Sequence, residues 1–152
     1  MADYHTQFSC ILDVGSAENA ARADMIRGEF AAELDRHEGE NLGFDMGIDH
    51  ETGPGALWIH SDEYGNPEHV ISFVLRCAGE LGLVGRWGFA WSYTCSKPRI
   101  DAFGGAAYVL KLTTGETVSY VDCTEFVSEH IAAGDADEAI AALQRSGGDD
   151  GS

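Results

Sequence analysis

The chain has 152 residues, of which 26 are Asp or Glu and nine are Lys or Arg, so its formal charge is −17. A field of this sign repels nucleic acid, because DNA binding depends on Lys and Arg side chains that neutralise phosphates. It also repels anionic membranes. We therefore expect neither direct nucleic-acid binding nor membrane binding. The length fits one domain, and the hydrophobic content of 44% is enough to form a core.

Targeting and metal-binding motifs are not recognisable in the sequence. No apolar run approaches membrane-spanning length and no charged-then-apolar leader precedes the first predicted strand, so we expect a cytoplasmic protein. The four cysteines, Cys10, Cys77, Cys95 and Cys123, form no C-x-x-C pair, which argues against a zinc ribbon or a thioredoxin motif. We expect reduced thiols, no metal and no cofactor.

The first two thirds of the chain predict the element order β-α-β-β-α-β. Apolar residues alternate in four predicted strands, at residues 5–14, 44–48, 56–60 and 87–95. Two helices are predicted from helical spacing of apolar residues, at 17–37 and 67–81. Ser16 is a good N-cap for the first helix, and Asn66 followed by Pro67 is a strong start signal for the second.

The strand predicted at 87–95 organises the fold. Its odd positions carry large or apolar side chains and its even positions carry small ones, so the two groups point to opposite faces of the sheet. The odd positions are Trp87, Phe89, Trp91, Tyr93 and Cys95. We expect this aromatic face to hold a layer of helices.

The last third of the chain predicts a hairpin followed by helices. Strands at 106–112 and 116–121 are separated by a turn-forming segment, Thr113–Gly115. Thr124 is a predicted cap for a short helix at 125–132, and Asp135 with Glu138 resembles a capping box before a last helix at 136–145.

These elements predict an α+β fold in one domain, residues 1–145, followed by a disordered acidic tail, residues 146–152. The sheet is expected to be mostly antiparallel with helices on one face. The first six elements match a ferredoxin-like βαββαβ core, which the C-terminal hairpin and one or two helices would extend. Fold alone assigns no function.

The charge suggests where a function would lie. Acidic side chains gather on the first helix and in the loops between residues 45 and 68, and we expect them to form an acidic binding face. The candidates are Glu29, Glu33, Asp35, Glu38, Glu40, Asp49, Glu51, Asp62, Glu63 and Glu68. Such a face would bind a basic surface of a partner protein, since opposite charges speed encounter. The acidity has a simpler interpretation, which stays open: it keeps the protein soluble or marks a salt-adapted proteome.

An alternative site lies at the end of the aromatic strand. Cys95 is followed by two bases that would lower the pKa of its thiol, and a histidine beside it would complete a nucleophile–base pair. The residues of this alternative pocket are His60, Trp91, Cys95, Lys97 and Arg99. The alternation of the strand also allows Cys95 to be buried and inert. No motif assigns a catalytic residue, so a non-enzymatic function is favoured.

The bases are unevenly distributed. Four of the nine lie between residues 86 and 111, namely Arg86, Lys97, Arg99 and Lys111. We expect a modestly cationic region near the aromatic strand and a strongly anionic remainder.

Three segments of the middle third resemble a known group of proteins. They are Leu57-Trp-Ile-His-Ser-Asp-Glu-Tyr-Gly-Asn-Pro-Glu-His69, Trp91-Ser-Tyr-Thr-Cys-Ser-Lys-Pro-Arg99 and Phe103-Gly-Gly-Ala106. The chain here resembles small acidic proteins carried by phages, plasmids and other mobile elements. The resemblance implies only such a genomic setting. By analogy with small acidic proteins that block host defence machinery in that setting, we expect an anti-defence role, in which the acidic face occupies a nucleic-acid-binding surface of a host complex. The resemblance implies no catalytic residue.

Overall fold

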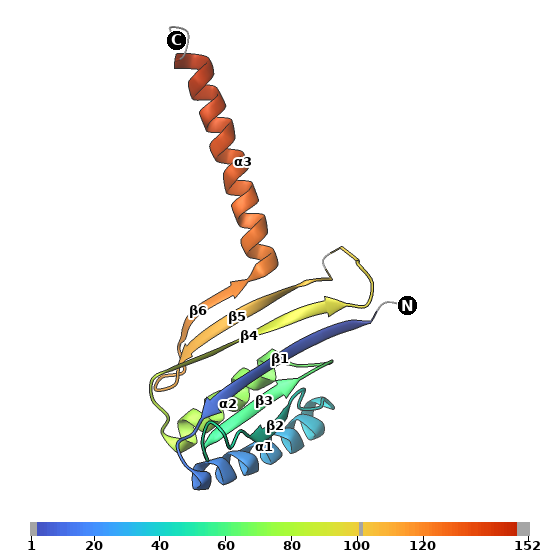
Figure 1. Cartoon of the computed structure of the whole chain (residues 1–152), viewed down its shortest axis with the longest axis vertical. Helices are drawn as coiled ribbons and strands as arrows, with labels where there is room; N and C mark the ends of the chain where they lie inside the picture. The colour runs from blue at the N-terminus through green and yellow to red at the C-terminus, as the bar shows by residue number, and fades with distance from the viewer. Residues whose placement is uncertain (1–2, 101, 149–152) are drawn as a thin grey trace.

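The computed structural model describes residues 3–100 and 102–148. Within these residues, six strands and three helices follow one another, and Figure 1 shows their arrangement. Their bounds are β1 Tyr4–Asp13, α1 Ala17–Glu38, β2 Asp45–Ile48, β3 Ala56–Ser61, α2 Pro67–Leu81, β4 Arg86–Cys95, β5 Gly104–Lys111, β6 Thr117–Asp122 and α3 Cys123–Gly148.

The strands form one antiparallel sheet in the order β2-β3-β1-β4-β5-β6. The predicted α+β class is therefore confirmed, and the predicted C-terminal hairpin extends the sheet beyond β4. Because β5 and β6 continue the sheet, its strand order differs from that of a four-stranded ferredoxin-like unit.

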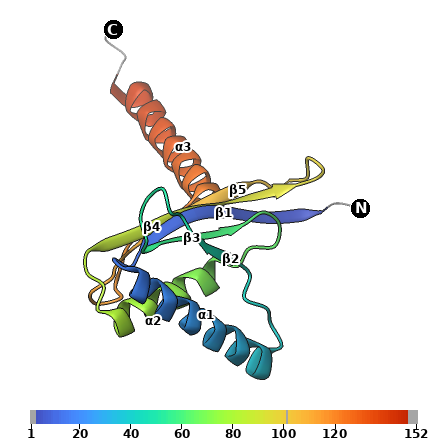
Figure 2. The same ribbon diagram turned by 60° about the horizontal axis from the view of Figure 1, so that its bottom comes forward.

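Helices α1 and α2 lie side by side on one face of the sheet (Figure 2). Both begin at the predicted caps: the Ser16 hydroxyl accepts the N–H of Asn19 at 3.1 Å, and the Asn66 side chain accepts the N–H of His69 at 3.2 Å. Both end at a glycine in the left-handed region, Gly39 with φ 63° and Gly82 with φ 65°. Local sequence signals therefore determine where these helices start and stop.

The core lies between the helices and the aromatic face of β4, as the alternation predicts. Trp87, Phe89 and Trp91 are each less than one tenth exposed. The Phe8 ring of β1 meets the Phe89 ring edge-on, with centroids 5.8 Å apart, and the Trp87 indole N–H donates to the Ile11 carbonyl at 2.8 Å. The buried indole therefore satisfies its one polar atom.

Of the one or two C-terminal helices expected, the structure has one, α3, which runs without the expected break between 132 and 136 and projects away from the sheet (Figure 1). Its first turn is capped by Asp122, whose carboxylate accepts the N–H of Glu125 at 3.0 Å, and not by Thr124. Gly134 lies inside the helix, where a glycine costs about 1 kcal/mol without ending it.

The start of the predicted tail also differs. Residues 146–148 continue α3, while 149–152 lie outside the described residues. Within the part of the chain that the structure describes, no helix is long and apolar enough to cross a membrane.

Candidate functional site

Two of the candidate acidic side chains on α1 form ion pairs with arginines. The Glu29 carboxylate lies 3.4 Å from the Arg22 guanidinium, and Glu33 lies 2.9 Å from that of Arg76. Arg76 also lies over the Phe30 ring, 4.4 Å from its centroid. These pairs link α1 internally and to α2, so Glu29 and Glu33 stabilise the local arrangement of the helices and are less available to a partner.

A second set of carboxylates converges where α1 ends and α2 begins. Here the two helices enclose a depression of about 460 Å³. We call it the acidic groove and define it by Glu33, Glu38, Glu40, Glu68 and His69, which line it together with Arg76. Four of the ten predicted acidic residues are thus brought together. Glu38 and Glu40 flank the turn at Gly39, and Glu68 lies in the first turn of α2.

The other predicted acids do not line this groove. Glu29 and Asp35 lie elsewhere on α1, and the remaining four are in loops. Asp49 and Glu51 belong to the β2–β3 turn, where the Asp49 carboxylate accepts the Thr52 hydroxyl at 2.6 Å. Asp62 and Glu63 are exposed in the β3–α2 loop. The single acidic face expected from the sequence is therefore a groove plus scattered carboxylates.

His69 is the buried centre of the groove and was missed by sequence reasoning. It is 9% exposed. Its Nδ1 lies 3.1 Å from the Leu42 carbonyl and its Nε2 lies 3.1 Å from the Glu40 carboxylate. This arrangement fixes the ring and directs Nε2 toward the carboxylates. No local motif reveals this contact, because Glu40 and His69 lie 29 positions apart in the sequence.

The same histidine belongs to a group that could hold a metal ion. One ligand atom each from Glu38, Glu40 and His69 lies within 4.8 Å of the others. An imidazole whose Nδ1–H donates to a carbonyl presents Nε2 as a ligand, and carboxylates complete such sets. Protonated His69 instead forms an ion pair with Glu40, and the geometry serves either state.

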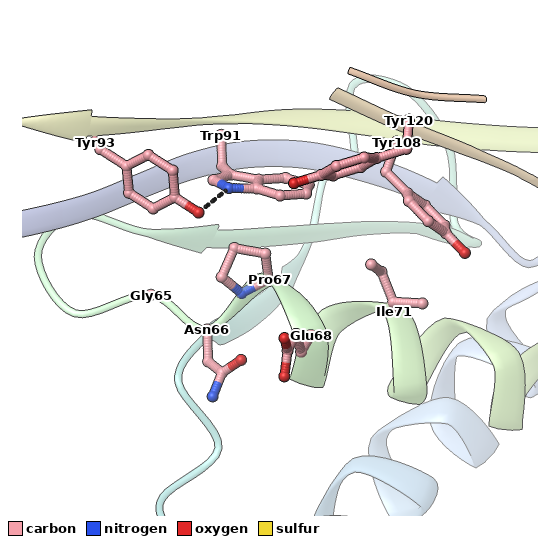
Figure 3. A pocket seen from close by; sticks show the side chains of 9 residues that line it. All are labelled: Gly65, Asn66, Pro67, Glu68, Ile71, Trp91, Tyr93, Tyr108 and Tyr120. Atoms are coloured by element: carbon pink, nitrogen blue, oxygen red, sulfur yellow. Dashed lines mark hydrogen bonds between the residues drawn. The ribbon is translucent and has the colours of Figure 1, made fainter. Parts of the chain in front are cut away.

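A second cavity, of about 430 Å³, opens on the other side of the α2 N-terminus (Figure 3). We call it the aromatic pocket and define it by Trp91, Tyr93, Tyr108, Tyr120 and Glu68. The aromatic rings come from β4, β5 and β6 and form one side in Figure 3, while Pro67, Glu68 and Ile71 of α2 form the other. The Trp91 indole donates to the Tyr93 hydroxyl at 2.8 Å.

The sheet places these rings together because its strands are in register. Tyr108 of β5 pairs directly with Tyr120 of β6, and their ring centroids are 6.3 Å apart. Trp91 lies 6.3 Å from Tyr120 by the same measure. Tyr120 is half exposed, so the helix layer leaves this part of the sheet open. The predicted turn at 113–115 already sets Tyr108 opposite Tyr120, a signal that could have identified the pair.

The alternative pocket does not assemble as predicted. Cys95 is 8% exposed and lies on the face that carries α1 and α2, whereas His60 lies on the opposite face, where its ring stacks on Trp58 with centroids 3.7 Å apart. Strand alternation separates them: Cys95 pairs with Tyr4 and His60 with Ser9, and these two positions of β1 point to opposite faces.

The remaining residues of that pocket are also dispersed. Trp91 belongs to the aromatic pocket, and Arg99 borders a separate shallow cavity beside Phe103 and Cys123. Lys97 is exposed in the loop after β4. Among the other thiols, burial raises the pKa of Cys10 and Cys77 to about 12, so both stay protonated at neutral pH.

The predicted cationic region is split between the two ends of β4. Arg86 begins the strand and pairs with Lys111, while Lys97 and Arg99 follow its last residue. A ten-residue strand spans about 30 Å. The four bases therefore do not form one patch.

Comparisons with protein families, with curated proteins and with solved structures found no match to this chain.

Proposed function

We propose that this chain is a non-enzymatic interaction protein that binds a basic surface of a partner through the acidic groove. The convergence of Glu38, Glu40 and Glu68 at one place supports this proposal. Among the described residues, no Lys or Arg lies within 4.0 Å of the carboxylates of Glu38 or Glu68. Carboxylates without a basic partner are those that gain most from an external one.

The wall of the groove is suited to binding because it is already organised. Arg76 is held by Glu33 on one side and by the Phe30 ring on the other. The positive charge of Arg76 is thus balanced within the wall, which leaves three carboxylates to attract a partner. Pre-organised groups lose less conformational entropy on binding. The net charge of −17 adds long-range steering toward a basic surface.

Affinity capture with two matched triple variants tests the proposal. The first variant carries Glu38→Gln, Glu40→Gln and Glu68→Gln in the groove, and the control carries Glu18→Gln, Glu51→Gln and Glu116→Gln outside it. Each changes the formal charge from −17 to −14, because three of the 26 acids are removed. We expect partners that the wild type and the control retain at low salt, and release at high salt, to be lost by the groove variant. Equal retention by both variants would contradict the proposal.

The identity of the partner is a further part of the proposal. A nucleic-acid-handling complex among the captured proteins would support an anti-defence role and the setting of phages, plasmids and other mobile elements that the sequence resemblance implies. We also propose that the first six elements form a ferredoxin-like unit. The arrangement β2-β3-β1-β4 within the sheet, with α1 and α2 on one face, supports that relationship.

A further inference from the structure

The aromatic pocket has a composition that the core does not require. Four aromatic side chains from three neighbouring strands line one side of a single cavity, and two of them stay substantially exposed, Tyr93 at 37% and Tyr120 at 50%. A volume of about 430 Å³ lies within the range of small-molecule sites. Aromatic rings around a cavity present the negative faces of their π-systems, which attract cations.

The charge around the pocket is negative and therefore also favours a cation. Glu68 is the charged residue that lines it, and no Lys or Arg is among the described residues of its lining. The pKa of the Tyr120 hydroxyl is raised, first by partial burial and then by the negative charge of Asp122, with smaller contributions from Tyr93 and Glu125. The hydroxyl therefore stays neutral at physiological pH, and the surroundings of the ring are anionic.

The N-terminus of α2 also borders the pocket, and a helix N-terminus ordinarily attracts anions. Three features oppose that here. Pro67 has no N–H to offer, the N–H of His69 is already bonded to the Asn66 side chain at 3.2 Å, and Glu68 places a carboxylate in the first turn. An anion entering the pocket would meet the carboxylate with few free donors to compensate.

We propose that the aromatic pocket binds an organic cation of the alkylated or quaternary ammonium class. The cation lies against the rings of Trp91, Tyr108 and Tyr120, and Glu68 supplies the opposite charge. Such a group is strongly attracted by aromatic faces and is too weakly hydrated to prefer water over them. It occurs in free small molecules and on alkylated lysine side chains of proteins, and both sources share the chemistry that the pocket recognises. This site is separate from the groove, although Glu68 borders both.

The test compares choline with 3,3-dimethylbutan-1-ol, its neutral analogue of the same shape. Binding is measured by calorimetry and by NMR of the Trp91 indole N–H, using the full chain. We expect choline to bind about tenfold more tightly than the neutral alcohol and to shift the Trp91 signal saturably. Comparable binding of the alcohol, or no saturable shift with choline at millimolar concentration, would overturn the proposal.

Two variants and a matched control locate the effect. Tyr120→Leu keeps apolar bulk but removes the π-face, and Glu68→Gln removes the charge, so each is expected to weaken choline binding several-fold, by about threefold to tenfold. Tyr64→Leu is the control, because Tyr64 is 69% exposed and does not line the pocket. Thermal melts of all three variants establish that they fold. Equal losses in Tyr64→Leu and Tyr120→Leu would place the cation elsewhere and refute the assignment.

The two sources of the cation are separated by a peptide comparison. A peptide with one trimethyl-lysine is titrated beside the same peptide with unmodified lysine. Tighter binding of the trimethylated peptide than of choline identifies a protein side chain as the ligand, and weaker binding identifies a free small molecule. Because Tyr120 lies outside the acidic groove, capture of a basic partner by Tyr120→Leu separates a failure here from a failure of the proposed function.

Discussion

Replacing Phe73 with alanine is expected to lower the free energy of unfolding by about 3–5 kcal/mol, the usual cost of truncating a buried phenylalanine. Phe73 is fully buried on the sheet-facing side of α2, where its ring meets Phe44 with centroids 5.4 Å apart. The substitution leaves a cavity between helix and sheet that rigid β-strands cannot close. Urea or guanidinium unfolding followed by circular dichroism measures the change.

Leu75→Ala is the control for this prediction. Leu75 lies on the same helix, but it is 37% exposed. Its truncation is expected to cost about 1 kcal/mol or less, because little apolar surface is removed from the core and alanine favours helix. Similar losses for the two variants would mean that α2 does not pack on the sheet through Phe73.

Gly55→Ala is expected to destabilise the fold by about 1–3 kcal/mol, as overpacking does. A Cβ at Gly55 would lie 2.6 Å from the backbone nitrogen of Ser16 and 2.7 Å from that of Gly15. Both atoms belong to the turn that caps α1, and the Val14 N–H bonds to the Gly55 carbonyl at 2.8 Å. Backbone atoms cannot rotate away, so the turn and the start of β3 must separate.

Gly53→Ala provides the matched comparison. Gly53 lies with Gly55 in the β2–β3 turn, and a Cβ at Gly53 would meet nothing within 4 Å. Its effect is expected to stay within about 1 kcal/mol, in the stabilising direction if alanine only restricts the unfolded chain. Thermal melts of the two variants decide the matter. Equal stability of Gly55→Ala and Gly53→Ala would show that the β1–α1 turn and the β2–β3 turn are not in contact.

Local chemistry made much of this fold predictable. The caps at Ser16 and Asn66 and the alternation of β4 each depend on a few consecutive residues. Their predicted positions agree with the structure to within a residue or two, because no distant contact competes with them. The hairpin of β5 and β6 was predictable for the same reason.

The predictions fail where the structure depends on contacts between residues that are distant in the sequence, or on the absence of such contacts. The capping-like pair Asp135 and Glu138 predicted a break that α3 does not have, and Gly134 beside it is too small a penalty to end a helix. His60 and Cys95 were expected to converge, but their faces depend on pairing with β1. Alternation was predictable within each strand, whereas the relation between strands required the register.

The candidate sites also combine features that are local in the sequence with features that depend on tertiary packing. The excess of acidic residues is visible in the sequence, whereas the gathering of four of them into a groove depends on how α1 and α2 pack side by side. The aromatic pocket depends on a sheet that is wider than its helix layer, so that Tyr120 stays half exposed. Neither property is local, and only Trp91 of the four rings was a candidate beforehand.

The most direct test of binding through the acidic groove is to map where a basic probe binds. The ¹⁵N-labelled chain is titrated with a short lysine-rich peptide at low salt, and amide shifts are followed by NMR. If the acidic groove is the binding site, we expect saturable shifts concentrated at Glu38, Glu40, Glu68 and His69, which weaken as salt is raised. Shifts of equal size spread over Asp49, Glu51 and the outer face of α1, without saturation, would mean that the acidity is diffuse and that the groove is not the binding site.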